Sequence, residues 1–109
     1  METTIEYLEF TKDEIPVSKK VDIDGTIYAV EIQYNEAGDF YTSVLYDEDD
    51  NVIVSSKLVY MGNAFGTGVK GAPNKKLIPL KISDLASDQP EDLRVNAETF
   101  GDSIKLYLV

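Results

Sequence analysis

The chain contains no histidine, no cysteine and no tryptophan among its 109 residues. Without histidine and cysteine it lacks the usual proton shuttle at neutral pH and the soft metal ligands. These absences exclude Ser-His-Asp and Cys-His catalytic sites, zinc fingers, iron–sulfur clusters and haem ligated by histidine. No disulfide can form, so the fold must be held by burial of apolar surface and by backbone pairing.

Long apolar runs and positive charge are also scarce. No stretch approaches the ~20 apolar residues that span a bilayer, and the N-terminus is acidic rather than basic and then apolar, as a signal peptide would be. The 20 Asp and Glu against 10 Lys and Arg give a formal net charge of −10, which opposes binding to nucleic acid or to anionic lipid. The sequence therefore predicts a soluble chain, made in a cytoplasm, with no nucleic-acid or membrane partner.

What the chain does contain is a hydrophobic period of two residues, which is typical of β-strands. The expected strands are 19–24, 26–34, 39–47, 51–61, 76–82 and 103–109, with an extra one within 2–10. Asp24-Gly25 predicts a type I′ turn between the first two, and Gly38 is available for a positive φ in the next turn. The length fits one domain, 1–109. We expect an all-β fold: a single small antiparallel β-sandwich or partly open barrel of about seven strands with minimal helix.

Two segments lack a clear period. Residues 62–74 hold four of the seven glycines and predict a long surface loop, and residues 83–99 form a second irregular stretch. Long loops are more often functional than idle. The apolar members of the first loop, Ala64, Phe65 and Val69, would be exposed to solvent unless something covers them.

Acidic and glycine motifs give no strong chemical signal. Asp47–Asn51 places oxygens at alternate positions, as a calcium loop would, but Val52 and Leu58 stand where that loop needs glycine and a bidentate glutamate. No spacing singles out a pair of carboxylates for glycoside hydrolysis. Gly66-Thr67-Gly68 lacks the Lys-Ser or Lys-Thr ending of a phosphate-binding loop. The sequence therefore predicts no catalytic residue, no metal site and no cofactor.

Seven tyrosines are the most unusual feature of the composition. Tyrosine is favoured in strands and is enriched at protein interfaces. Strand alternation places three of them with the apolar sets, as core residues: Tyr28, Tyr34 and Tyr46. Three others could lie on the opposite faces and are interface candidates: Tyr41, Tyr60 and Tyr107.

Charge is unevenly spread along the chain. Residues 1–50 carry 14 acids and 3 bases, residues 51–83 carry five lysines and no acid, and residues 84–109 carry 6 acids and 2 bases. Either the lysines pair with acids of their own fold, or the basic loop docks on an acidic partner surface. The second interpretation adds five loop residues to the interface candidates: Phe65, Val69, Lys70, Lys75 and Lys76.

The order of these features resembles the phage baseplate plug family, small all-β proteins of contractile tails. The resemblance covers residues 15–109 and rests on the strand order, on Asn35, on the turn at Gly62 and on the short closing strand after Gly101. Family members often carry tryptophan in the strand that matches Phe40-Tyr41, where this chain has none.

The resemblance implies a structural, non-enzymatic component of the tail baseplate of a phage or phage-tail-like particle, made in the cytoplasm of the bacterial host. It implies contacts with hub, spike and wedge proteins and with copies of the same chain. We expect an edge strand at 2–10 or 103–109 to pair with a neighbouring subunit, and the 62–74 loop to become ordered on contact. The alternatives are a free-standing β-sheet module that binds carbohydrate or a bacterial protein, and a carboxylate hydrolase.

Overall fold

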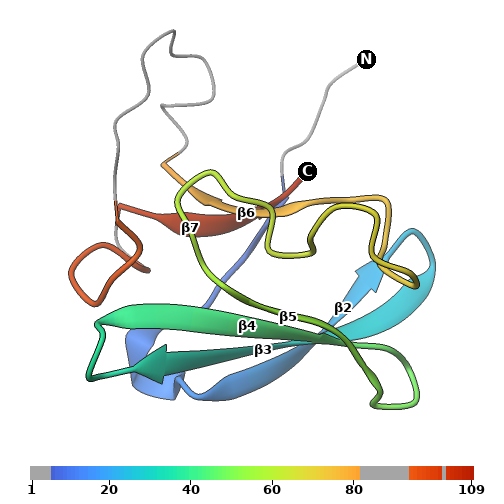
Figure 1. Ribbon diagram of the computed structural model, residues 1–109, viewed down its shortest axis with the longest axis horizontal. Helices are drawn as coiled ribbons and strands as arrows, with labels where there is room; N and C mark the ends of the chain where they lie inside the picture. The colour runs from blue at the N-terminus through green and yellow to red at the C-terminus, as the bar shows by residue number, and fades with distance from the viewer. Residues whose placement is uncertain (1–5, 82–93, 102) are drawn as a thin grey trace, which may run out of the picture.

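Two antiparallel sheets make up the molecule, one above the other in Figure 1. The computed structural model describes residues 6–81, 94–101 and 103–109, so most of the expected irregular stretch 83–99 lies outside the described residues. The elements follow in the order β1 (Glu6–Leu8), η1 (Lys12–Glu14), β2 (Val17–Ile23), β3 (Thr26–Asn35), β4 (Phe40–Tyr46), β5 (Val52–Lys57), β6 (Leu77–Leu80) and β7 (Lys105–Leu108). The all-β prediction is confirmed. In the described part of the chain no helix is long and apolar enough to cross a membrane.

The lower sheet is a meander in the order β2-β3-β4-β5. Its first turn has Asp24 at φ 54° and Gly25 at φ 88°, as a type I′ turn requires, and the Asp22 carboxylate accepts the Gly25 N–H at 2.9 Å. In the next turn the positive φ of 51° belongs to Asp39. The expectation for Gly38 was therefore wrong, and its lack of a side chain serves another purpose. A Cβ there would lie 2.5 Å from the Phe40 ring.

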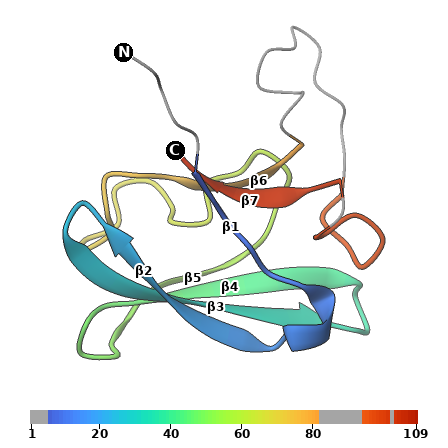
Figure 2. The same cartoon turned by 180° about the vertical axis from the view of Figure 1, so that it is seen from behind.

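The upper sheet has the order β1-β7-β6, so the final strand is its centre. Figure 2 shows β1 leading down from this sheet to η1 beside the lower one. The prediction that 103–109 offers an edge to a neighbour was wrong, because both sides of β7 are already paired. The outer edge of β6 is partly covered as well. Met61 donates its N–H to Pro79 O at 2.8 Å, and Ala64 donates to Leu77 O at 2.7 Å.

The core lies between the two sheets, and the strand register decides which face of β4 enters it. Ser43 lies opposite Ile32, and Leu45 lies opposite Val30. Directly opposed residues of an antiparallel pair share a face, so Tyr41, Ser43 and Leu45 point inward and are buried. The predicted core position of Tyr46 was wrong, because both alternating sets of β4 contain apolar side chains. The predicted core positions of Tyr28 and Tyr34 are confirmed, as both pack against the core.

Candidate interaction surfaces

The glycine-rich loop after β5 is folded onto the core. Ala64 and Phe65 are buried, so the cover that these two residues require comes from their own chain. Asn63 holds this segment in place. Its Oδ1 accepts the N–H of Phe65 at 3.0 Å and of Leu77 at 3.1 Å, and its Nδ2 donates to Gly66 O at 2.7 Å. Residues 63–66 are therefore ordered by the chain itself and need no partner for it.

Three of the predicted interface residues have no free surface for a partner in this fold. Phe65 is 2% exposed, Tyr41 3% and Tyr107 8%. Tyr41 packs between two other rings, with centroids 4.8 Å from Tyr34 and 4.4 Å from Phe100. Tyr107 lies on the central strand of the upper sheet. The prediction that these three side chains contact a partner is therefore corrected, because their own chain already covers nearly all of their surface.

The other predicted interface residues keep solvent-accessible surface. Lys70 and Lys76 are exposed, and Val69, Lys75 and Tyr60 are half-buried. The Tyr60 hydroxyl accepts the N–H of Lys81 at 3.1 Å. Whether these residues contact a partner stays a prediction.

Among the described residues, the lysines of residues 51–76 form no ion pair. The ion pair found there joins Lys19 to Glu14 at 3.0 Å, and none involves the four lysines of this segment: Lys57, Lys70, Lys75 and Lys76. Lys57 lies over the Phe40 ring instead, 4.7 Å from its centroid. The interpretation that the basic stretch pairs with acids of its own fold therefore finds no support at these four residues in the described part of the chain.

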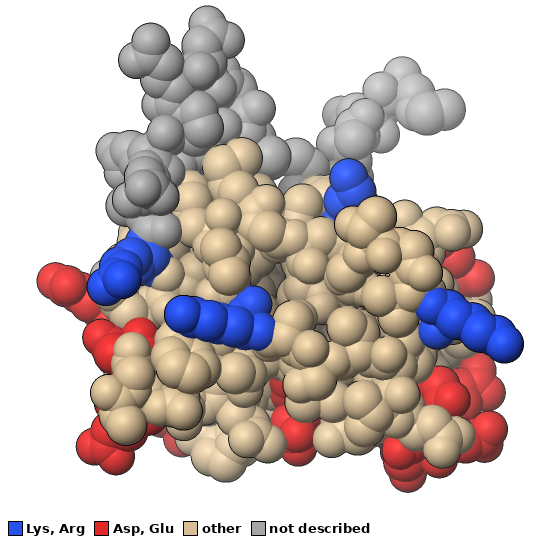
Figure 3. Space-filling view, viewed as in Figure 1, with Lys and Arg blue, Asp and Glu red and all other residues tan. Residues whose placement is uncertain are grey.

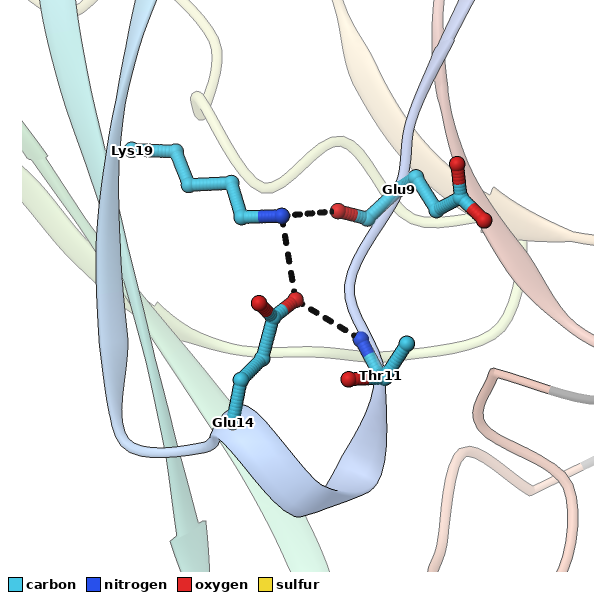
Figure 4. A network of polar contacts seen from close by, with 4 residues as sticks. All are labelled: Glu9, Thr11, Glu14 and Lys19. Carbon is cyan, nitrogen blue, oxygen red and sulfur yellow. Dashed lines mark hydrogen bonds and ion pairs between the residues drawn. The ribbon is translucent and has the colours of Figure 1, made fainter.

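The one described ion pair belongs to a network that fastens residues 9–14 to β2 (Figure 4). Lys19 Nζ also donates to Glu9 O at 2.6 Å, and Glu14 Oε1 accepts the Thr11 N–H at 2.8 Å. The hydrogen bond from Thr11, and then the contact with Lys19, hold the pKa of Glu14 below its ordinary value. The β2 edge is thus occupied in part by the segment that precedes it.

Charge separates over the face of the molecule shown in Figure 3. In Figure 3 most Asp and Glu atoms lie along the lower half of the molecule, where the lower sheet and its turns are, and Lys and Arg atoms lie at mid-height or above. The turn after β4 is the most acidic segment, with Glu48, Asp49 and Asp50 all exposed. Long-range approach of a charged partner is therefore favoured in one orientation over others.

The acidic turn is organised by its own backbone rather than by a metal ion. Asp47 Oδ1 accepts the N–H groups of Asp49 and Asn51, each at 2.9 Å. These bonds, with Asn51 contributing most, hold the pKa of Asp47 below its ordinary value. Among the described residues no three Asp or Glu side chains gather as a metal-binding group.

A groove of about 280 Å³ opens where β5 ends. Its lining is formed by the end of β5 with the residues that follow it and by two other segments: Gly38, Asp39, Phe40, Lys57, Leu58, Val59, Tyr60, Arg94, Val95 and Asn96. Asp39 joins its walls, since its Oδ1 accepts the Tyr34 hydroxyl at 2.7 Å and the Ala97 N–H at 3.0 Å. Sequence reasoning missed Asp39, because Ala97 lies 58 residues away and no local pattern joins the two.

The hydrogen bonds of this link shift the pKa values of both side chains that it joins. The hydrogen bond from Tyr34, followed by that from Ala97, holds the pKa of Asp39 below its ordinary value. The same contact raises the pKa of Tyr34 to about 12. A general acid at neutral pH needs a raised carboxyl pKa, whereas the shifts at Glu14, Asp39 and Asp47 are all downward.

Comparison with known proteins assigns the family. A family model described as "Cyanophage baseplate Pam3 plug gp18" matches residues 5–109, essentially the whole chain. The chain belongs to this baseplate plug family. Its role is thus that of a structural component of a phage tail baseplate. No curated protein and no solved structure matches the chain.

This member of the plug family has four edge strands: β1, β2, β5 and β6, of which β6 is covered by the N–H groups of Met61 and Ala64. They differ in what guards them. β1 has only three residues, and short edges offer little to pair with. β2 carries Lys19, Lys20 and Asp22, and such charges blunt an edge. β5 is apolar or uncharged until its last residue, Lys57.

Proposed function

We propose that this plug protein joins the hub, spike and wedge proteins of the baseplate. In this proposal its basic side, the surface that carries Lys70, Lys75 and Lys76, docks on an acidic surface of one of these proteins. The observation that carries the proposal is that Lys70, Lys75 and Lys76 make no ion pair within the described residues. Surface charges that lack an internal partner are free to steer and orient a docking protein.

The segment that precedes these lysines, residues 63–66, is fixed to the core, which supports a connecting role. Asn63 fixes residues 63–66 against the core through three hydrogen bonds. The lysines that follow are therefore presented from an anchored loop, so that docking costs less ordering entropy than it would from a free one. Tyr60 and Val69 add partly accessible apolar surface next to the basic side chains.

The test replaces two exposed lysines, Lys70→Gln together with Lys76→Gln, in the plug protein of an assembling particle. We expect the amount of plug protein that purifies with particles to fall, and to fall further as salt is raised, because surface ion pairs are screened over about 8 Å at 0.15 M salt. The measurement is the ratio of plug to tube protein in purified particles.

A matched control removes the same charge elsewhere. Lys12→Gln together with Lys20→Gln also changes two exposed lysines, so the net charge falls equally, and incorporation should stay at the wild-type level. Equal incorporation of both double variants contradicts docking through the basic side. Isolated wild-type protein that binds a carbohydrate saturably and is missing from particles would favour the free-standing module instead.

A further inference from the structure

The outer edge of β5 (Val52–Lys57) has backbone groups with no partner among the residues that the structure describes. The β4–β5 ladder pairs Ser56 with Ser43, and it continues with Leu58 donating its N–H to Tyr41 O at 2.8 Å. In an antiparallel ladder alternate residues bond to the neighbour, and those between them point away. Ser55 and Lys57 therefore direct their N–H and C=O groups outward, where no described residue accepts or donates.

This edge has less protection than the other three. Natural proteins guard edge strands with lysine, with charge, with shortness, with a bulge or with a covering segment. β1 is short, β2 carries three charged residues and is tethered to residues 9–14 through Lys19, and β6 is covered by Met61 and Ala64. β5 runs for six residues with its one charge at the end, and its ladder with β4 is irregular only at its start, between Leu45 and Tyr46, so the rest of β5 is a template for a further strand.

We propose that β5 of one copy pairs with β5 of a second copy, antiparallel and about a two-fold axis at Ser55. The two four-stranded sheets then form one continuous sheet of both copies. Ser55 lies opposite the second copy's Ser55, because these are the residues whose backbone groups point outward. This pairing does not depend on the baseplate role.

The exposed apolar side chains fit this arrangement. The two most exposed large hydrophobic residues of the described chain are Val52 at 61% and Val59 at 57%, and they lie on either side of Ser55. Antiparallel pairing at Ser55 sets Val59 opposite the second copy's Asn51, next to the second copy's Val52. Each end of the joint therefore lies beside the valines that the fold leaves in water, Val52 of one copy and Val59 of the other.

The charges fit it as well. β5 is preceded by the acidic turn with Glu48, Asp49 and Asp50 and is followed by no acid up to residue 83. Reversing one copy against the other brings Lys57 of each toward the acidic turn of its mate. Lys57 has no ion pair among the described residues, and a strand in the opposite sense would lose this complementarity. A second copy is therefore the occupant that the sequence of β5 favours.

Because the chain contains no cysteine, a single introduced cysteine can test the pairing by disulfide crosslinking without interference from other thiols. In Ser55→Cys the two thiols would stand opposite each other, at the ~4.5–5.5 Å between Cβ atoms of opposed residues, which a disulfide can bridge with small adjustment. We expect a covalent dimer to form under mild oxidation at 0.15 M salt, at least tenfold faster than in Ser18→Cys. Ser18 is an exposed serine on the other long edge strand.

A non-covalent test uses the same two positions. Ser55→Lys places like charges opposite each other and should raise the dimer dissociation constant at least tenfold in sedimentation equilibrium, whereas Ser18→Lys should leave it within twofold. Lys57→Glu should weaken the dimer, and adding Asp49→Lys should restore it. Thermal melts of each variant check that the monomer still folds.

Three results would overturn the pairing. The first is a wild-type chain that stays monomeric up to millimolar concentration. The second is equal oxidation rates for the two cysteine variants. The third is a Ser55→Cys protein that, within assembled particles, crosslinks to a different protein rather than to itself. In each case the chain's presence in the baseplate is unaffected, so failure here is distinguishable from failure of the docking proposal.

Discussion

Replacing Phe65 tests whether the glycine-rich loop is part of the core. The side chain is 2% exposed, so Phe65→Ala removes a fully buried ring and leaves a cavity. Such substitutions cost about 3–5 kcal/mol, out of the ~5–15 kcal/mol that stabilise a small protein. If the ring lay in solvent awaiting a partner, the cost would be below about 0.5 kcal/mol.

Urea denaturation of the isolated chain measures this difference. With a slope of ~1–3 kcal/mol per molar urea for small proteins, the midpoint should fall by roughly 1–5 M. Phe65→Leu keeps most of the volume and should cost less than about 2 kcal/mol, which gives a measurable value even if the alanine variant is unfolded.

The control is Val109→Ala, since Val109 is an exposed apolar residue that belongs to neither proposed interface. We expect its free energy of unfolding to stay within about 0.5 kcal/mol of wild type. If Phe65→Ala behaves like Val109→Ala, the packed loop is refuted and Phe65 returns to the interface candidates.

Two further predictions concern the polar links. Asn63→Ala should lower the free energy of unfolding by about 2–3 kcal/mol, because two N–H donors and one carbonyl lose their partner at ~1 kcal/mol each; a urea midpoint equal to wild type would contradict this. Tyr34 should ionise near pH 12, where its raised pKa lies, and Asp39→Asn should bring that ionisation down toward pH 10 in an ultraviolet titration. Because the folded pKa of Tyr34 is raised, its contribution to stability is complete below pH 10 and is lost as pH rises through 12. Because the folded pKa of Asp39 is lowered, its contribution is present above its unfolded pKa of ~3.9 and is lost as pH falls through the folded value. If Asp39→Asn leaves the loss of stability at acid and at alkaline pH unchanged, the hydrogen bond between Tyr34 and Asp39 does not make this contribution.

Local signals predicted the lower sheet well. The two-residue period and the Asp24-Gly25 dipeptide depend on residues that are neighbours in sequence, so the hairpin could be read directly. The orientation of β4 could not, because both of its faces carry aromatic and aliphatic side chains. Only the pairing of Ser43 with Ile32 decides which set is buried.

The glycine-rich loop shows a different limit. Its composition predicted the irregular path of the chain but not its burial, since glycine reports backbone freedom rather than exposure. The residue that anchors this loop, Asn63, does have a local signal. An asparagine side chain can accept the backbone N–H two residues further on in an Asx turn, and Asn63 does so with Phe65. The link from Asp39 to Ala97 had no such signal.

Because β7 is the central strand of the upper sheet, the two sheets are expected to fold at different times. The lower sheet is built from successive hairpins, and such local contacts form fast. The upper sheet must join Glu6 to Leu108, a contact that almost spans the chain and that loop closure makes slow. We therefore expect the meander to assemble first, with its inner face open until β7 enters between β1 and β6. In that interval the molecule is a half-covered sheet with an open β5 edge, and its yield in the cell then depends on how quickly the last strand finds its place.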